Sequence, residues 1–200
     1  MQGLFKSAVL VAISGCDERL GYCELREGSS LVSKAITGAH SGDHVIERYL
    51  DVARYLGAEI PVGELDFPMP NLDKETASVS KKLLDKGMPG NCEYVVMVPG
   101  ARWWTKEWPV EHYAKLAQMI TEDGHYVVLA GGPDDASKGA KIKELSQEAK
   151  VIDMTGQTSL RELAALIKGC QVYISADTGP LHFAAALKKP LVAMYGPTKA

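Results

Sequence analysis

The sequence predicts an α/β fold built from parallel sheets with helices on both faces. Two observations lead to this prediction. From residue 94 onward, short and almost continuous apolar runs alternate with longer segments of helical periodicity, and loops containing glycine or proline separate them. Strands that are apolar along their whole length are typical of parallel sheets buried on both faces, and their alternation with helices is typical of a doubly wound sheet. The hydrophobic share of 46% is ordinary for a globular protein.

Residues 1–90 are predicted to form an incomplete domain of this kind and the bridge to a second domain. The periodicity predicts, in chain order, a helix over residues 4–13, a short strand over 19–22, and amphipathic helices over 43–56 and 73–86. Between the last two helices the chain is rich in proline and glycine, which is typical of a connection between domains. The chain opens in a helix with no strand before it and stops just after a strand, so we expect a fragment of a longer protein.

Residues 91–200 are predicted to form a Rossmann-like domain. Its strands are expected at residues 94–98, 126–130, 151–152, 172–175 and 191–195, and its helices at 110–121, 136–149, 159–168 and from Asp177 onward. In such a sheet ligands bind outside the carboxyl ends of the strands. Each loop that follows a strand is therefore a candidate part of the site.

The loop after the fourth strand of this domain leads directly into a helix, at Asp177-Thr178-Gly179-Pro180-Leu181-His182. Asp177 is the predicted N-cap, and Pro180 fits the first turn, where its missing N–H costs nothing. The free amides and the dipole at a helix start attract anions. Gly179 would allow a ligand close to the backbone, and Thr178 and His182 add donors. The local chemistry predicts a phosphate site, with an ordinary capped helix as the alternative.

The loop after the first strand of this domain combines a cation, a hydroxyl and three tryptophans. Lys106 supplies a point charge suited to phosphate, and Thr105 supplies a hydroxyl. We expect Trp108 to lie in the core. For Trp103 and Trp104 the sequence leaves two interpretations open, core packing and a patch that contacts a partner.

Two motifs in this domain resemble those of one enzyme family. The run from Asp177 to Leu187, continued by Lys189-Pro190 and Tyr195-Gly196-Pro197-Thr198, resembles the donor-site motif of the bacterial lipopolysaccharide heptosyltransferases, glycosyltransferase family 9. The same family's phosphate-binding loop resembles Pro99-Gly100-Ala101-Arg102 followed by Thr105-Lys106-Glu107-Trp108-Pro109. Two long motifs in the right order are specific. The resemblance covers nearly the whole chain and implies a GT-B-like architecture of two Rossmann-like domains, the first incomplete here.

The resemblance also implies roles for individual residues. Lys106 and Asp177 are the expected catalytic residues, and the expected donor-binding residues are Thr105, Lys106, Asp135, Thr158, Ser159, Thr178, Gly179, Pro180 and His182. Within that set Asp135 would bind the ribose, and Thr158 and Ser159 would lie beside the adenine. From the residues alone, Asp134 and Asp135 are both suited to cap the helix that follows them, and Ser159 with Glu162 has the form of a capping box. Arg26 is the expected acceptor-binding residue, with a solvated surface arginine as the alternative.

The activity implied by the resemblance is transfer of heptose from ADP-heptose to the lipopolysaccharide inner core, with inversion. The resembling enzymes need no metal or cofactor, and their general base is an aspartate upstream of the region around Gln2. Two alternatives stay open: another sugar-nucleotide enzyme of the same architecture, such as a 2-epimerase, and a non-catalytic nucleotide-binding remnant. No GxGxxG or Walker pattern follows a predicted strand, so the sequence supports neither a nicotinamide enzyme nor a P-loop ATPase.

Net charge argues against one class of partner, and hydropathy argues against a membrane-spanning chain. A formal net charge of −3 argues against generic nucleic-acid binding, which usually shows a basic surface. No apolar run reaches the roughly 18 residues that a membrane span needs, and no signal-type segment opens the chain. We therefore expect a cytoplasmic protein. The family resemblance implies a nucleotide-sugar donor and a lipopolysaccharide core acceptor as its partners, with peripheral association at the inner face of the inner membrane.

Overall fold

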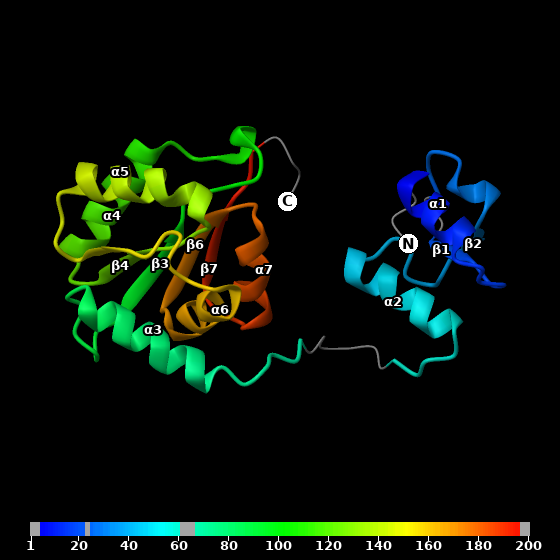
Figure 1. The fold of residues 1–200 in the computed structure, drawn as a ribbon, viewed down its shortest axis with the longest axis horizontal. Helices are drawn as coiled ribbons and strands as arrows, with labels where there is room; N and C mark the ends of the chain where they lie inside the picture. Colours follow the sequence, from blue (N-terminus) through cyan, green and yellow to red (C-terminus); the bar gives the residue numbers. More distant parts are fainter. Residues whose placement is uncertain (1–4, 23–24, 61–66, 197–200) are drawn as a thin grey trace. The chain divides into compact units, whose positions relative to one another are not determined.

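The computed structural model describes residues 5–22, 25–60 and 67–196 (Figure 1). Contacts between Cα atoms divide the chain into two compact units, Met1–Leu65 and Asp66–Ala200. Each unit has its own parallel sheet. Among the described helices, none is long and apolar enough to cross a membrane.

The described residues of the first unit form a two-stranded parallel sheet and two α-helices. Its elements are α1 (Phe5–Ile13), β1 (Leu20–Tyr22), the 3-10 helix η1 (Ser29–Leu31), β2 (Lys34–Ile36) and α2 (Val45–Tyr55). Strands β1 and β2 pair with Leu20 opposite Lys34. The predicted helices and the strand β1 are confirmed. The sequence did not predict β2, because three residues between polar turns carry no periodicity.

A buried carboxylate organises this unit. The Asp51 carboxylate accepts hydrogen bonds from the Tyr22 hydroxyl at 3.1 Å, the His40 backbone N–H at 3.0 Å and the Arg54 guanidinium at 3.1 Å. Burial by itself would raise the pKa of Asp51, but these donors together hold it below its ordinary value. The carboxylate thereby connects β1, the turn around His40 and helix α2.

The second unit is a five-stranded, fully parallel sheet in the order β5-β4-β3-β6-β7. The strands are β3 (Tyr94–Val98), β4 (Tyr126–Leu129), β5 (Val151–Asp153), β6 (Val172–Ala176) and β7 (Leu191–Met194). Helices α4 (Val110–Glu122), α5 (Ala136–Ser146), α6 (Leu160–Gly169) and α7 (Gly179–Ala186) connect them, and α3 (Asp73–Asp85) precedes the first strand. Because β3 lies beside both β4 and β6, the strand order reverses at β3 and β6. This is the topological switch point of a doubly wound sheet.

Helices cover both faces of this sheet (Figure 1). Helices α3, α6 and α7 pack on one face, where Val96 and Val98 of β3 are buried. Helices α4 and α5 pack on the other face, against Val95 and Met97. Adjacent residues of one strand thus enter opposite cores, which explains why β3 is apolar along its whole length. The predicted α/β fold with parallel sheets is confirmed.

Helix α3 belongs to the second unit. Val79 and Leu83 are buried in the core that α3 shares with α6, and the Ser78 hydroxyl donates to Glu162 of α6 at 2.7 Å. The division between the units therefore falls at 65/66 and not at the predicted 90/91. Helical periodicity reveals that α3 has an apolar face, but not which core that face joins. Residues 61–66 of the predicted connection lie outside the described residues.

Candidate functional site

The site candidates lie along one edge of the five-stranded sheet. Lys106, Asp135, Ser159 and Thr178 each lie in the loop that follows one of the parallel strands β3, β4, β5 and β6. Parallel strands end at the same edge of a sheet, so the four loops share the rim where ligands of such folds bind. The fold thus gathers the predicted donor-binding residues of the second unit at one rim.

Two of these loops are joined by an ion pair at the switch point. The Lys106 ammonium lies 2.5 Å from the Asp177 carboxylate, and the two side chains are only 19% and 27% exposed. Behind this pair, a Cβ added to Gly196 would lie 2.8 Å from the Thr105 carbonyl oxygen, so the chain after β7 packs closely against the turn that holds Lys106. The two predicted catalytic residues are therefore in direct contact. Pro197 and Thr198 of the same motif lie outside the described residues.

Helix α7 begins one residue later than the sequence predicted. Its N-cap is Thr178, whose backbone is extended with φ −144° and ψ 164°, and no side-chain cap bond forms there. The predicted N-cap role of Asp177 is wrong, because β6 continues to Ala176 and the Asp177 carboxylate pairs with Lys106 instead. Pro180 lies in the first turn as expected.

The start of α7 faces open space. A Cβ added to Gly179 would meet no heavy atom within 4 Å, and His182 is exposed on the same helix. The first amides of an α-helix have no partner within the helix. Here Pro180 has no N–H and the Leu181 N–H donates to the Thr178 carbonyl at 3.1 Å, so the rim offers the Gly179 N–H and a positive dipole end next to a lysine.

Asp135 lies where the loops after β3 and β4 meet. Its carboxylate accepts from the Gly132 backbone N–H at 3.0 Å and lies 3.7 Å from the Lys138 ammonium. A Cβ added to Gly100 would collide with this carboxylate, so glycine at that position is needed for the two loops to approach. Asp135 thus stabilises the 3-10 turn η3 (Pro133–Asp135) and borders the β3 loop. It is the N-cap residue of α5, but its side chain forms no cap bond to that helix, so the predicted capping of the helix is wrong.

Ser159 forms the predicted capping box at the start of α6. Its hydroxyl accepts from the Glu162 N–H at 3.2 Å, and its own N–H donates to the Glu162 carboxylate at 2.8 Å. The Glu162 carboxylate also lies 2.7 Å from the Lys82 ammonium. The hydrogen bond from Lys82, followed by those from Ser159 and Ser78, lowers the pKa of Glu162 to about 2. Thr158, immediately before the cap, is half-buried.

Sequence reasoning missed one ion pair at this rim. Glu107 follows Lys106 directly, and its carboxylate lies 2.5 Å from the ammonium of Lys138 on α5. The two partners are 31 positions apart along the chain. No local pattern relates them, and only the pairing of β3 with β4 brings their loops together.

The remaining candidates lie elsewhere. Arg26 is exposed in the first unit, where its carbonyl accepts from the Ser29 N–H at 3.0 Å, and its acceptor role stays a prediction. Trp108 is partly buried and packs against the core, edge-on to Tyr113 with ring centroids 5.0 Å apart. Trp103 and Trp104 are 60% and 81% exposed, so core packing is excluded for both.

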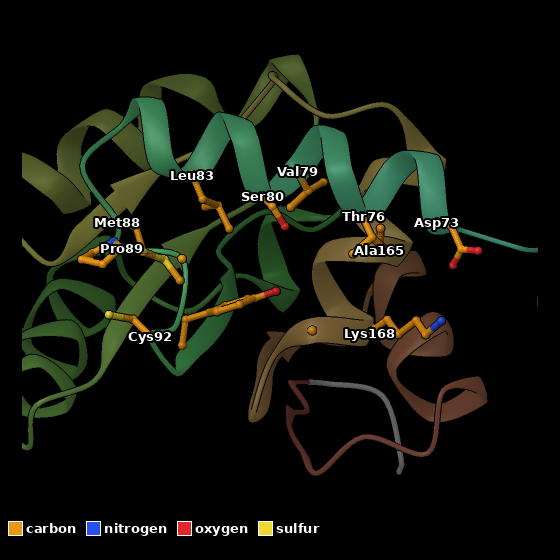
Figure 2. A pocket seen from close by; sticks show the side chains of 13 residues that line it. Asp73, Thr76, Val79, Ser80, Leu83, Met88, Pro89, Cys92, Ala165 and Lys168 are labelled. Carbon is orange, nitrogen blue, oxygen red and sulfur yellow. The ribbon is translucent and has the colours of Figure 1, made fainter.

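A cavity of about 410 Å³ lies at the opposite edge of the sheet (Figure 2). Its lining comes from α3, from the end of α6 and from the start of β3, and includes Ser80, Leu83, Cys92, Tyr94 and Gly169. Tyr94 is the first residue of β3 and Gly169 the last of α6, so the cavity lies beside the amino ends of the strands. It is therefore separate from the rim that carries Lys106.

The fold and the rim define the class of protein: a doubly wound α/β protein whose switch-point loops present a helix start and a lysine. Comparison with known sequences then gives the family. Residues 1–200 match the family described as glycosyltransferase family 9 (heptosyltransferase), and the chain belongs to it. Lipopolysaccharide heptosyltransferase 2 of Escherichia coli and its namesake in Salmonella typhimurium are each 31% identical over 97% of this chain and 58% of their own length.

Solved structures agree with this assignment. The structure of E. coli ADP-heptose lps heptosyltransferase II matches with a TM-score of 0.75 and 27% identity, over 98% of this chain and 61% of that one. E. coli heptosyltransferase WaaC with ADP matches with a TM-score of 0.74 and 28% identity, over 100% of this chain and 61% of that one. The GT-B-like architecture is thereby confirmed. The chain spans about 58% of the length of these curated relatives.

Proposed function

We propose that this protein is a glycosyltransferase that transfers heptose from ADP-heptose to the lipopolysaccharide inner core with inversion at the anomeric carbon. The contact between Lys106 and Asp177 beside the start of α7 is the observation that carries the proposal. A lysine and a helix N-terminus at one switch point suit the diphosphate of a nucleotide sugar. The names of the relatives, and the similarity to WaaC solved with ADP, support the same donor.

In this proposal the diphosphate binds at the first turn of α7. The Gly179 N–H and the Thr178 hydroxyl donate to the phosphate oxygens, and Gly179 leaves the helix start open. Pro180 has no N–H, and the Leu181 N–H donates to the Thr178 carbonyl at 3.1 Å. His182, exposed on the same helix, is a further donor, and Thr105 adds a hydroxyl from the β3 loop. These groups bind the leaving group and leave the anomeric carbon accessible to the acceptor.

Lys106 has the central chemical role in the transfer step. The acceptor hydroxyl oxygen forms a bond to the anomeric carbon while the bond from that carbon to the diphosphate oxygen breaks, and the acceptor proton passes to a general base. Negative charge grows on the departing ADP. Lys106 is already held beside the helix start, so its charge needs little reorganisation to stabilise this leaving group.

The nucleoside would extend from the helix start along the rim. Asp135 would accept from the ribose hydroxyls with whichever oxygen its turn leaves accessible, and Thr158 and Ser159 would lie beside the adenine. We further propose that no metal assists, because Lys106 and the helix start supply positive charge at the diphosphate. Among the residues that the structure describes, no group of three or more His, Cys, Asp and Glu side chains gathers as a metal site.

We also propose that the protein acts in the cytoplasm at the inner membrane face, where its lipopolysaccharide acceptor would be anchored. The exposed Trp103 and Trp104 support peripheral contact, because tryptophan favours the boundary between lipid and water. Arg26 would contact an anionic group of the acceptor through its planar guanidinium. No role for nucleic acid is proposed.

Calorimetry with ADP, in the presence and absence of a chelator, tests the donor site. We expect ADP to bind equally well in both conditions, and UDP and GDP to bind more weakly. A strict requirement for Mg²⁺, or no preference for ADP, would contradict the proposal. Incubation of the complete protein with ADP-heptose alone separates a transferase from an epimerase, because only the epimerase alters the sugar without an acceptor.

A further inference from the structure

Two consecutive residues of the β3 loop form ion pairs with loops on opposite sides. Lys106 contacts Asp177 after β6, and Glu107 contacts Lys138 in the first turn of α5, after β4. Both contacts measure 2.5 Å, and all four side chains are between 19% and 27% exposed. The turn that carries Lys106 is therefore held from both sides.

Lys138 connects more than two groups. Besides Glu107 it lies 3.7 Å from the carboxylate of Asp135, which in turn contacts its own turn at the Gly132 N–H. One ammonium thus links the turn after β4 to the turn after β3. Glycine at position 100 is what allows the Asp135 carboxylate to lie against the β3 loop.

The β3 loop has few other means of holding its shape. Its 3-10 turn, η2 (Trp104–Lys106), is closed by bonds within the loop: Lys106 N–H donates to the Trp103 carbonyl at 2.9 Å, and Glu107 N–H to the Trp104 carbonyl at 3.1 Å. Trp103 and Trp104 face solvent. Apolar packing against the core begins at Trp108, and Gly196 lies close to the backbone of Thr105. Among the described contacts, the side chains of Lys106 and Glu107 themselves are held by the two ion pairs.

We propose that Glu107 and Lys138 are positioning residues that hold the Lys106 ammonium at the start of α7, an inference that rests on the proposed donor site. Consecutive Cα atoms are about 3.8 Å apart, so a displacement of Glu107 also displaces Lys106. When ADP binds, the Lys106 ammonium exchanges part of its contact with the Asp177 carboxylate for a contact with phosphate. During that exchange the pair of Glu107 with Lys138 keeps the turn in place, since neither member contacts the diphosphate.

Binding of ADP and of adenosine to matched variants tests this inference. Glu107→Gln and Lys138→Gln should each weaken ADP binding about fivefold or more, as expected for coupled neighbours. Adenosine should bind to Glu107→Gln as it does to the parent, because adenosine has no phosphate; Lys138→Gln is compared through ADP alone, because Lys138 also lies beside Asp135. The double variant should be no weaker than the worse single variant, because both changes remove the same contact. Lys138→Arg keeps the charge and should restore ADP binding.

Glu144→Gln is the matched control, because it breaks the 3.1 Å ion pair between Glu144 and Lys141, which lies beyond the first turn of α5. It should leave ADP binding unchanged, and circular dichroism should show that every variant is folded. Equal ADP affinity in the parent and the variants Glu107→Gln and Lys138→Gln, or equal loss of ADP and adenosine binding in Glu107→Gln, would overturn the positioning role. Failure of the parent itself to bind ADP would instead overturn the proposed donor site and this inference with it.

Discussion

The four strand-end loops of the second unit divide into two kinds. After β4 and β5, the candidate side chains stabilise their own turns: Asp135 accepts from Gly132 at 3.0 Å, and Ser159 exchanges two hydrogen bonds with Glu162. After β3 and β6, Lys106 and Asp177 instead contact each other across the switch point. A group that closes its own turn cannot change partner without loosening that turn, whereas an ion pair between two loops can exchange one carboxylate for a phosphate.

This difference assigns separate tasks to the two kinds of loop. The loops after β4 and β5 have a shape that is set before any ligand arrives, so they suit the uncharged parts of a nucleotide. The loops after β3 and β6 carry the ion pair of Lys106 and Asp177, in which the ammonium can exchange its carboxylate partner for a phosphate. These two loops therefore suit the diphosphate. Substitutions in the first kind should therefore change mainly stability, and substitutions in the second kind should change mainly binding and turnover.

The largest effect is expected for Lys106→Ala. In the complete protein, kcat should fall about 10²-fold or more, because the lost ammonium stabilises charge that grows as the donor bond breaks. The fold loss in donor binding should be smaller than the loss in kcat. Lys141→Ala is a control, since Lys141 forms an exposed pair with Glu144 and should leave steady-state rates unchanged. If Lys106→Ala left kcat unchanged, the loops after β3 and β6 would have no special role in turnover, and the division into two kinds of loop would be wrong.

Glu162→Ala should have the largest effect on stability. The substitution removes one half of the capping box and leaves Ser78 and Lys82 without their carboxylate. We expect a loss of about 2 kcal/mol in the free energy of unfolding, measured by urea denaturation. ADP affinity of the folded fraction should stay within twofold of the parent. A variant as stable as the parent would show that the α3–α6 contact does not depend on this carboxylate.

The same carboxylate predicts how stability depends on pH. Its pKa in the folded state, about 2, is below the ordinary value of 4.5, so the unfolded chain binds the proton more readily. This contribution is fully present above pH 4.5 and is lost as the pH falls through about 2. In acid titrations, the parent should therefore lose more stability over this range than Glu162→Gln, which has no proton to take up. Parallel curves for the two proteins would contradict the assignment.

Asp177→Asn tests what the carboxylate charge at this position does. Both Asn and Ala remove the ion pair with Lys106, and each should lower stability by about 1 kcal/mol. ADP should bind about two- to fivefold more tightly, because a negative charge beside the diphosphate is removed. Weaker ADP binding by the Asn variant, measured by calorimetry, would show that Asp177 orients the site and does not merely neutralise Lys106.

The smallest effect is expected for Ser159→Ala. Loss of the N-cap hydroxyl should reduce stability by about 1 kcal/mol or less, since the Glu162 carboxylate still accepts from the backbone N–H of residue 159. Binding of ADP and of adenosine should be equal to that of the parent within twofold. A loss of adenosine binding without loss of stability would instead identify the Ser159 hydroxyl as a contact to the base. The loop after β5 would then act in binding and not only in stabilising its own turn.

Local physical chemistry was enough to predict much of this protein. The continuous apolar run of β3 and the helical periods around it predicted the parallel sheet, because burial on both faces requires such strands. The capping box of Ser159 and Glu162 could be predicted because its two members are three residues apart on one turn. The motifs that contain Lys106 and Asp177 led to the correct family.

Other features depend on contacts that no local pattern contains. The cap of α7 lies at Thr178 and not at Asp177, because the backbone angles at the end of β6 decide where a helix begins. Helix α3 joins the second unit because its apolar face meets α6. Glu107 and Lys138 meet only because β3 and β4 lie side by side and bring their loops together. Sequence determines which groups a segment carries, whereas the packing of strands and helices decides which distant groups become partners.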